Sequence, residues 1–304
     1  SGGGFLVRSA DRVVLEKTLF IGNDAAGGGG LNTLYAEDLL VSNAIFLENE
    51  AGTSGGMNLL DSSTHLNNAL VIKNTASDNS LGVGGGITID GPGELQIQNI
   101  VITNNQAEGY GGGIASAEDT SVYNSSIMNN RTGSSPGDHG GGISAGDTLD
   151  ITNTIIVDNQ SAATSTGGGL GGGNSDRWTV EYCNTFGNTP DNYDDEFPDP
   201  TGTNGNISVE PLFLDTATFH SLLWDLHLDP ASPLVDAGDP TILDPDGSPS
   251  DIGAFGGPGA AAWDLDWDGY PSWWQPGPYD HTTYPDEGWD CNDLDPDVYP
   301  GNGC

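Results

Sequence analysis

The fold can be read from one segment of the chain, "GDHGGGISAGDTLDITNTIIVDNQ", which spans Gly137–Gln160. Three glycines precede an isoleucine, then comes a run of alternating apolar residues, and then an asparagine. Consecutive glycines are unfavourable to order, because glycine loses more conformational freedom on folding than any other residue. Such a feature needs a structural reason, and its recurrence along the chain supplies one.

The pattern occurs seven times at nearly constant spacing. The apolar residue after the last glycine recurs every 26 to 30 residues, at Phe5, Leu31, Met57, Ile87, Ile114, Ile143 and Leu170. An asparagine keeps the same period, at Asn23, Asn49, Asn74, Asn105, Asn130, Asn159 and Asn188. In five repeats another asparagine stands six residues earlier, at Asn43, Asn68, Asn99, Asn124 and Asn153. Self-similarity of this period indicates a solenoid.

Apolar residues alternate within each repeat, as in Leu95 and Ile97 or Leu149 and Ile151. Alternation between turn-forming residues is typical of short strands. A repeat of about 27 residues suits a three-sided coil whose strands pair with their equivalents in the next coil. The sequence therefore predicts an all-β fold, a right-handed parallel β-helix.

The glycines and asparagines have architectural roles in this prediction. Successive coils stack at about 4.8 Å. Glycine is expected at one corner because it permits a positive φ and a close approach of the backbones. The asparagines Asn23 to Asn188 are expected to adopt the left-handed conformation at another corner and to form a hydrogen-bonded ladder.

The repeated motifs also resemble a known family. "GGGI", "GGGL", "FIGN", "FLEN", "ITNN" and "IVDN" are similar to the GGA-[I/L/V] and F-x-x-N repeats of chlamydial polymorphic outer-membrane proteins, and to secreted bacterial right-handed β-helix proteins in general. The resemblance covers roughly residues 1–190. It implies the fold and an extracellular or cell-surface location on a bacterium, but not one function, since such folds include adhesins, enzymes and structural proteins.

Composition excludes several classes of partner. The chain has 44 acidic residues and 6 lysines plus arginines, for a net charge of −38. Nucleic acids and anionic membranes bind basic surfaces, so neither is expected as a partner. The charge instead predicts screening by cations in a calcium-containing extracellular medium. With no transmembrane run or signal peptide, and with Ser1 already inside the first repeat, we expect a processed chain without membrane insertion.

The regular period ends near residue 190, where an acidic, turn-rich insertion begins. Three later segments resemble the closing segment of bacterial β-helix proteins: Pro211–Phe213, Ser232–Gly238 and Asp251–Phe255. We therefore predict regular coils over 1–190, an insertion and irregular closing coils over 191–257, and a separate module over 258–304.

At the N-terminus the chain enters in full repeat register without a cap, so the open strand edge is expected to be covered by preceding chain or by another subunit.

The last region carries a calcium-site pattern. "DLDWDG" places Asp264, Asp266 and Asp268 before a glycine, as in the first half of an EF-hand loop. Gln275 stands where that loop has its bidentate glutamate, so later carboxylates must complete the ligand shell, and "DCNDLDPD" supplies them: Asp290, Asp293 and Asp295. "DPDGSPSD" is a weaker candidate, with Asp244, Asp246 and Asp251, for which a plain turn is the alternative.

The same region has a second resemblance. "GWDCNDLDPDVYPG" is similar to a D-C-x-D-x-D-P metal-binding module of bacterial surface proteins, which implies that the two acidic elements cooperate. Cys291 and Cys304 bracket an acidic loop and are candidates for a disulfide in an oxidising compartment. The alternative is a solvated acidic tail, but five tryptophans argue against it, because disordered tails are poor in aromatic residues: Trp263, Trp267, Trp273, Trp274 and Trp289.

Two functions remain open. The first is a noncatalytic extracellular structural or surface protein (a fibre subunit, adhesin or sheath component) stabilised by calcium. Its expected partner is another copy, head to tail in a filament, or a cell-surface glycan or protein.

The second function is that of a polysaccharide-active enzyme, like pectate lyases or polygalacturonases. A lyase needs basic residues beside the uronate, and they are few and scattered here. A hydrolase needs clustered carboxylates, and Asp119, Asp147 and Asp150 are the candidates, each in a turn. We predict the noncatalytic protein.

Overall fold

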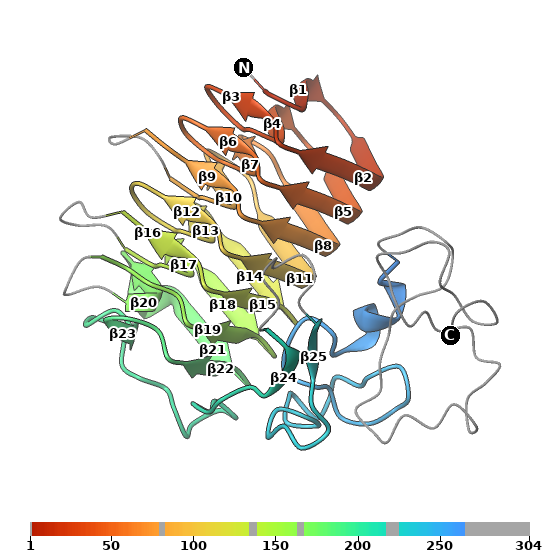
Figure 1. Ribbon diagram of the computed structural model, residues 1–304, viewed down its shortest axis with the longest axis vertical. Coiled ribbons are helices and arrows are strands. Elements are labelled where there is room, and N and C mark those ends of the chain that lie inside the picture. The colour runs from red at the N-terminus through yellow and green to blue at the C-terminus, as the bar shows by residue number, and fades with distance from the viewer. Residues whose placement is uncertain (1, 79–82, 134–138, 163–166, 217–224, 265–304) are drawn as a thin grey trace.

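The computed structural model describes residues 2–78, 83–133, 139–162, 167–216 and 225–264. These residues form a parallel β-solenoid of about seven turns with almost no helix (Figure 1). The predicted all-β solenoid is thereby confirmed. Two short 3₁₀ segments are the helices of the described part, η1 (Ser175–Arg177) and η3 (Pro258–Ala262).

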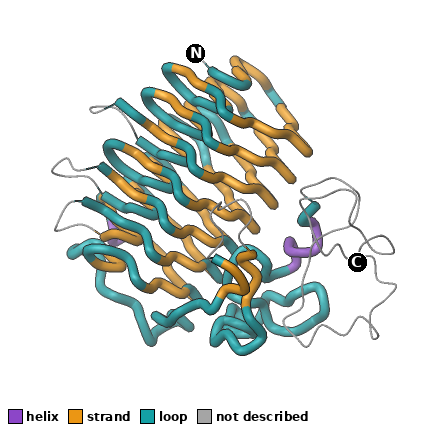
Figure 2. The backbone as a smooth tube through the Cα atoms, in the orientation of Figure 1, coloured by secondary structure: helices purple, strands orange, loops and turns teal. Residues whose placement is uncertain are grey.

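Three parallel sheets form the wall of the solenoid. The eight-stranded sheet contains β1 (Phe5–Ala10), β4 (Leu31–Ala36), β7 (Met57–Leu60), β10 (Ile87–Asp90), β13 (Ile114–Ser116), β17 (Ile143–Ala145), β20 (Gly167–Gly172) and β23 (Asp191–Tyr193). The five-stranded sheet contains β3 (Asp24–Ala25), β6 (Glu50–Ala51), β9 (Thr75–Ala76), β12 (Gln106–Ala107) and β16 (Arg131–Thr132). Figure 2 shows the strands of successive coils stacked on one another.

The ten-stranded sheet bends in the middle of each coil and so has two arms. In the first coils one strand crosses the bend: β2 (Val13–Ile21), β5 (Leu39–Leu47), β8 (Thr64–Ile72) and β11 (Leu95–Thr103). In the later coils the two arms are separate strands: β14 (Thr120–Tyr123) and β15 (Ser126–Met128), β18 (Leu149–Thr152) and β19 (Ile155–Val157), β21 (Trp178–Glu181) and β22 (Asn184–Phe186).

Strand register follows the sequence repeat. Ile87 of β10 pairs with Met57 in the preceding coil and with Ile114 in the next coil. The side chains that follow the glycines point inward, and all except Phe5 are fully buried. They form a continuous core with the alternating residues of the ten-stranded sheet, such as Leu95 and Ile97. The alternation in the sequence thus corresponds to one buried face per strand.

The predicted asparagine ladder is present inside the coils. Asn105 Nδ2 donates to Asn130 Oδ1 at 2.9 Å and to the Val71 carbonyl at 2.8 Å. Asn105 Oδ1 accepts from the backbone N–H and the side chain of Asn74, both at 2.9 Å. The same bonds link all seven predicted positions, and Asn192 extends the ladder by one more step at 3.0 Å from Asn188.

The backbone conformation predicted for the ladder is wrong by one position. None of the seven ladder asparagines has a positive φ, whereas the residue before each one does, for example Glu48 at 53° and Lys73 at 54°. The reason is geometric. The left-handed residue turns the chain, and the asparagine after it then points into the coil, where its amide meets the next ladder residue.

The glycine triplet combines the two roles that glycine can have. Gly140, the first glycine of the triplet in Gly137–Gln160, has a φ of 61°. Gly141 lies under the next coil, where an added Cβ would stand 2.5 Å from backbone atoms of Gln160. Positive φ therefore explains the first glycine, and close approach of the backbone explains the glycines that follow.

Residues 204–209 run along the last coil. The Ile207 N–H donates to the Cys183 carbonyl at 2.9 Å, and the Val209 N–H donates to Asn184 Oδ1 at 2.9 Å. The chain then forms an antiparallel pair, β24 (Phe213–Asp215) and β25 (Asp225–Leu228). From there it turns back along the side of the ten-stranded sheet (Figure 1, cyan to blue). We call residues 225–264 the strap.

Candidate functional site

The second row of asparagines lies at the bend of the ten-stranded sheet. Asn43, Asn68, Asn99, Asn124 and Asn153 have φ values between 41° and 50°. Asparagine is among the few residues that tolerate this conformation, which explains why it recurs there. We call these five residues the rail.

Each rail asparagine hydrogen-bonds to the strap. The pairs are Asn153–Asp239 (2.7 Å), Asn124–Ser250 (2.8 Å), Asn99–Gly256 (2.7 Å), Asn68–Gly259 (3.0 Å) and Asn43–Asp264 (3.3 Å). The residue numbers of the strap partners increase from Asp239 to Asp264 as those of the rail asparagines decrease from Asn153 to Asn43. The strap therefore runs back along the solenoid, from the later coils toward the first, with at least one hydrogen bond to each of these five coils.

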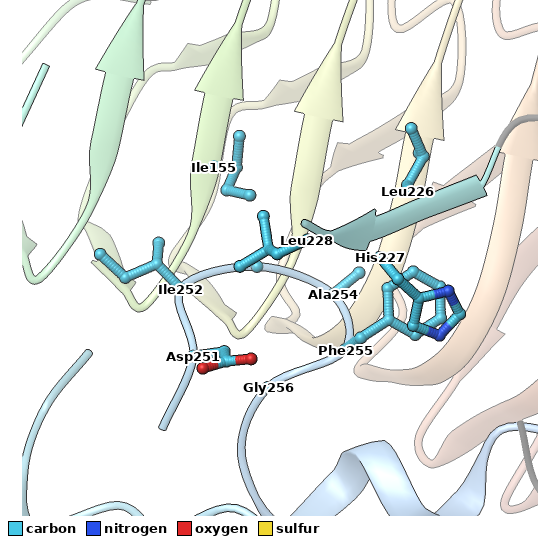
Figure 3. A pocket seen from close by; sticks show the side chains of 10 residues that line it. Ile155, Leu226, His227, Leu228, Asp251, Ile252, Ala254, Phe255 and Gly256 are labelled. Atoms are coloured by element: carbon cyan, nitrogen blue, oxygen red, sulfur yellow. The ribbon is translucent and has the colours of Figure 1, made fainter. Parts of the chain in front are cut away.

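An apolar interface accompanies these bonds. The second arm of the sheet carries outward-facing apolar residues, which the strap buries: Ile45, Leu47, Leu70, Ile72, Val101, Met128, Ile155 and Val157. Trp263 is fully buried, and its Nε1 donates to the Ala254 carbonyl at 3.0 Å. Figure 3 shows the Phe255 ring beside the His227 imidazole, with centroids 3.8 Å apart. The cavity there is about 10 Å³, room for at most one water.

The predicted calcium ligands divide between two parts of the chain. Asp264 is described: its Oδ2 pairs with Lys17 Nζ at 2.7 Å, and its backbone N–H donates to Asn43. This ion pair fastens the end of the strap to the first coil. Asp266, Asp268, Asp290, Asp293, Asp295, Cys291 and Cys304 lie outside the described residues. Their ligand and disulfide assignments stay predictions.

The weaker candidates shape the loops of the strap. Asp244 accepts hydrogen bonds from the N–H groups of Asp251, at 3.0 Å, and Gly257. Asp251 Oδ1 accepts from the Asp236 N–H at 2.8 Å, and Asp246 Oδ1 from the Ser248 N–H at 2.9 Å. Over the described ranges no group of three or more His, Cys, Asp or Glu has a metal-binding arrangement. A calcium site at these three aspartates stays a prediction.

Two strap carboxyls are shifted toward the neutral form. Burial raises the pKa of Asp251 to about 7 and that of Asp244 to about 6. Backbone N–H donors oppose the shift, while the neighbouring carboxylates, Asp236 and Asp246 among them, add to it. The strap therefore holds carboxyls that ionise near neutral pH.

We expect the strap to become more stable as pH falls from 8 to 5. The Asp251 pKa of about 7 exceeds the unfolded value of about 3.9, so between about pH 4 and 7 the folded state binds more protons. The free energy of unfolding then falls as pH rises through that window. In the presence of chelator, calorimetry at several pH values should show this slope. Asp251→Asn should reduce the loss of unfolding free energy between pH 5 and pH 8 by about 1 kcal/mol or more. An unchanged slope in the variant would contradict the assignment.

A groove of about 790 Å³ runs over the outer face of the eight-stranded sheet. Its lining extends from Leu6 in β1 to Gly173 beyond β20, so it follows the axis of the stack. Asn32, Asn58 and Thr88, one per coil, lie on its floor. We call this feature the groove.

The floor and one wall of the groove are chemically distinct. Asn58 Nδ2 donates to Asn32 Oδ1 at 3.2 Å, and Ser54 Oγ donates to Thr88 Oγ1 at 2.7 Å. The wall carries Tyr110 and His139, whose rings are nearly parallel (17°) with centroids 5.9 Å apart. The floor therefore presents ordered amides and hydroxyls, and the wall presents aromatic rings.

The carboxylates considered for hydrolysis are not all together. Asp119 and Asp147 both lie near Glu118. The pKa of Glu118 is raised first by desolvation and then by repulsion from Asp147, Asp90 and Asp119. Asp147 also pairs with Arg177. Asp150 lies instead in β18 of the ten-stranded sheet, in register with Ser121 and Thr179. Sequence reasoning missed Glu118, although it stands next to Asp119 at the same turn.

Comparison with known proteins adds no relative. No protein-family model, no curated protein and no solved structure matches this chain. Within the described ranges, none of the helices is both long enough and apolar enough to cross a membrane.

Proposed function

We propose that this chain is a noncatalytic extracellular scaffold of the right-handed β-helix type, displayed on or secreted by a bacterium and stabilised by calcium. The observation that carries the proposal is that the recurring asparagines form structural hydrogen bonds. The ladder ties each coil to the next, and the rail ties five coils to the strap. The repeated polar residues thus make the solenoid rigid, as expected of a rod that presents its surface to partners.

Calcium is proposed because of charge and sequence. A net charge of −38 repels itself and repels other copies, and divalent cations relieve that repulsion. Asp264 anchors the strap on Lys17, directly before the other five proposed ligands. End-to-end association of copies belongs to the proposal, because edges of parallel strands can pair head to tail.

Thermal unfolding and sedimentation test both parts. One millimolar calcium, but not sodium at equal ionic strength, should raise the melting temperature by several degrees, since an ion that binds only the folded state stabilises it. Sedimentation velocity should show larger species in calcium alone. The double variant Asp266→Asn/Asp268→Asn should lose the thermal shift, whereas Asp195→Asn, an exposed carboxylate outside the proposed site, should keep it. No thermal shift in the unaltered protein would refute the calcium proposal, and monomers throughout would refute association.

A polysaccharide-active enzyme is the second candidate, favoured by the raised pKa of Glu118 beside the groove. A carboxyl of this kind can serve as a general acid. Release of reducing ends from plant and bacterial polysaccharides, lost in Glu118→Gln, would support this candidate over the scaffold. No release from the unaltered protein would count against it.

A further inference from the structure

From the groove we infer a binding site for a linear neutral polysaccharide, lying lengthwise across the coils between the Tyr110–His139 wall and the polar floor. The inference deepens the proposed scaffold by naming the chemistry of one partner. It stands on shape, on the groups that line the groove, and on charge.

The shape of the groove suits a chain-like ligand. Its volume of about 790 Å³ is within the usual range for ligand pockets, about 300–1,000 Å³. It follows the axis of the stack through successive coils, each about 4.8 Å from the next. An extended polymer can therefore contact several coils at once, whereas a compact ligand would leave most of the groove empty.

The groove offers a ligand side-chain groups for hydrogen bonding, and not backbone groups. Strands β4 to β20 of the eight-stranded sheet each pair with a neighbour on both sides, so their N–H and C=O groups are used within the sheet. An extended peptide binds a sheet by adding a strand at a free edge, and strands β4 to β20 offer none. That difference favours a ligand recognised through hydroxyl groups over one recognised through peptide groups.

The lining matches the two kinds of surface on a sugar ring. Hydroxyl groups need fixed donors and acceptors, which Asn58 and Thr88 supply from the hydrogen-bonded floor. Asp90, exposed and lining the groove, adds a carboxylate acceptor. The C–H faces of sugars pack on aromatic rings, and Tyr110 is 47% exposed at the wall. Aromatic groups with few rotatable bonds lose little entropy on binding.

Charge selects against acidic polymers. Asp90, Glu118 and Asp147 lie close enough together that Asp90 and Asp147 raise the pKa of Glu118. The whole chain carries −38 charges. Arg8 lines the groove at its β1 end, but Asp90, the carboxylates next to it and the charge of the whole chain give uronate, sulfate or phosphate polymers a net repulsion. The neutral class is therefore the one that fits.

The experiment is calorimetric titration of the full chain with neutral hexasaccharides of the β-glucan, xylan, mannan and chitin types, and with oligogalacturonate. We expect one or more of the neutral hexasaccharides to bind at least tenfold more tightly than its disaccharide, with less than a twofold change between 50 and 500 mM salt. Tyr110→Ala should weaken binding at least tenfold. Tyr123→Ala, an exposed tyrosine on the ten-stranded sheet, should leave binding unchanged.

Three results would overturn the inference: no binding by any neutral hexasaccharide, binding of oligogalacturonate alone, or equal binding by Tyr110→Ala and the unaltered protein. Circular dichroism of Tyr110→Ala must match the parent, which is expected for an exposed side chain. The calcium-induced thermal shift, measured on the same samples, should be the same with and without Tyr110. Absence of sugar binding by the unaltered protein, with that shift intact, would refute the groove and leave the scaffold standing. Release of reducing ends would instead identify an enzyme.

Discussion

Replacement of Asn105 by alanine should lower the free energy of unfolding by about 3–5 kcal/mol. Asn105 is fully buried in the middle of the ladder, with hydrogen bonds to Asn130, Val71 and Asn74. Alanine leaves the Asn74 N–H and the Val71 carbonyl buried without these partners, and each unsatisfied group costs about 1–3 kcal/mol. Calorimetry or urea unfolding followed by circular dichroism measures the change.

Asn67 provides the matched control. It lies in β8 of the ten-stranded sheet, but is only half-buried and belongs to neither the ladder nor the rail. Asn67→Ala should change stability by less than about 0.5 kcal/mol, as is usual for surface positions. If the two alanine variants lose equal stability, the ladder does not hold the coils together as argued.

The ladder also shows what a sequence period can and cannot predict. Recurrence at a fixed step identifies which residues stack, because equivalent positions in a solenoid lie above one another. It does not say which of two adjacent residues takes the left-handed conformation. At Glu48 and Lys73 the structure uses residues without a preference for it, because the corner is imposed by the whole coil. Local propensity loses to tertiary context at these positions.

The strap was not predictable from the repeats, although they contain a trace of it. "AIFL" at 44–47 and "ALVI" at 69–72 are continuous apolar runs and not alternating ones. Such runs indicate strands buried on both faces. They do not say what covers the outer face, because the covering segment has no period and lies far away in the sequence, 191 residues in the Asn68–Gly259 contact and 221 in the Asn43–Asp264 contact.

The groove escaped prediction for a related reason. Its floor and wall combine one or two residues from each of several coils, such as Asn58, Thr88 and Tyr110. None of them belongs to a local motif. Only the stacking of coils brings them together, whereas the acidic motif of the last region is local and could be recognised without a structure.

Trp263→Ala should release the strap while the coils stay folded. Trp263 is fully buried and contacts Phe255, with ring centroids 5.2 Å apart. Loss of a buried tryptophan costs about 3–5 kcal/mol, which is a large fraction of what one apolar interface and the rail hydrogen bonds contribute. The solenoid core consists of other residues and does not include the strap. We therefore expect two unfolding transitions in the variant, the earlier one confined to the strap.

Hydrogen exchange with mass spectrometry can locate that transition. In Trp263→Ala, amides of residues 250–264 should exchange at least tenfold faster than in the parent, while those of β8 and β11 should stay protected, because their partners lie in neighbouring coils. Trp178→Ala is the matched control: this tryptophan belongs to the solenoid core, so its loss should expose β21 and β18 before the strap. Equal acceleration in strap and coils for Trp263→Ala would mean that the strap is part of one cooperative unit with the coils. It would then act as a structural element of every coil that the rail touches, and not as a clasp closed over a finished solenoid.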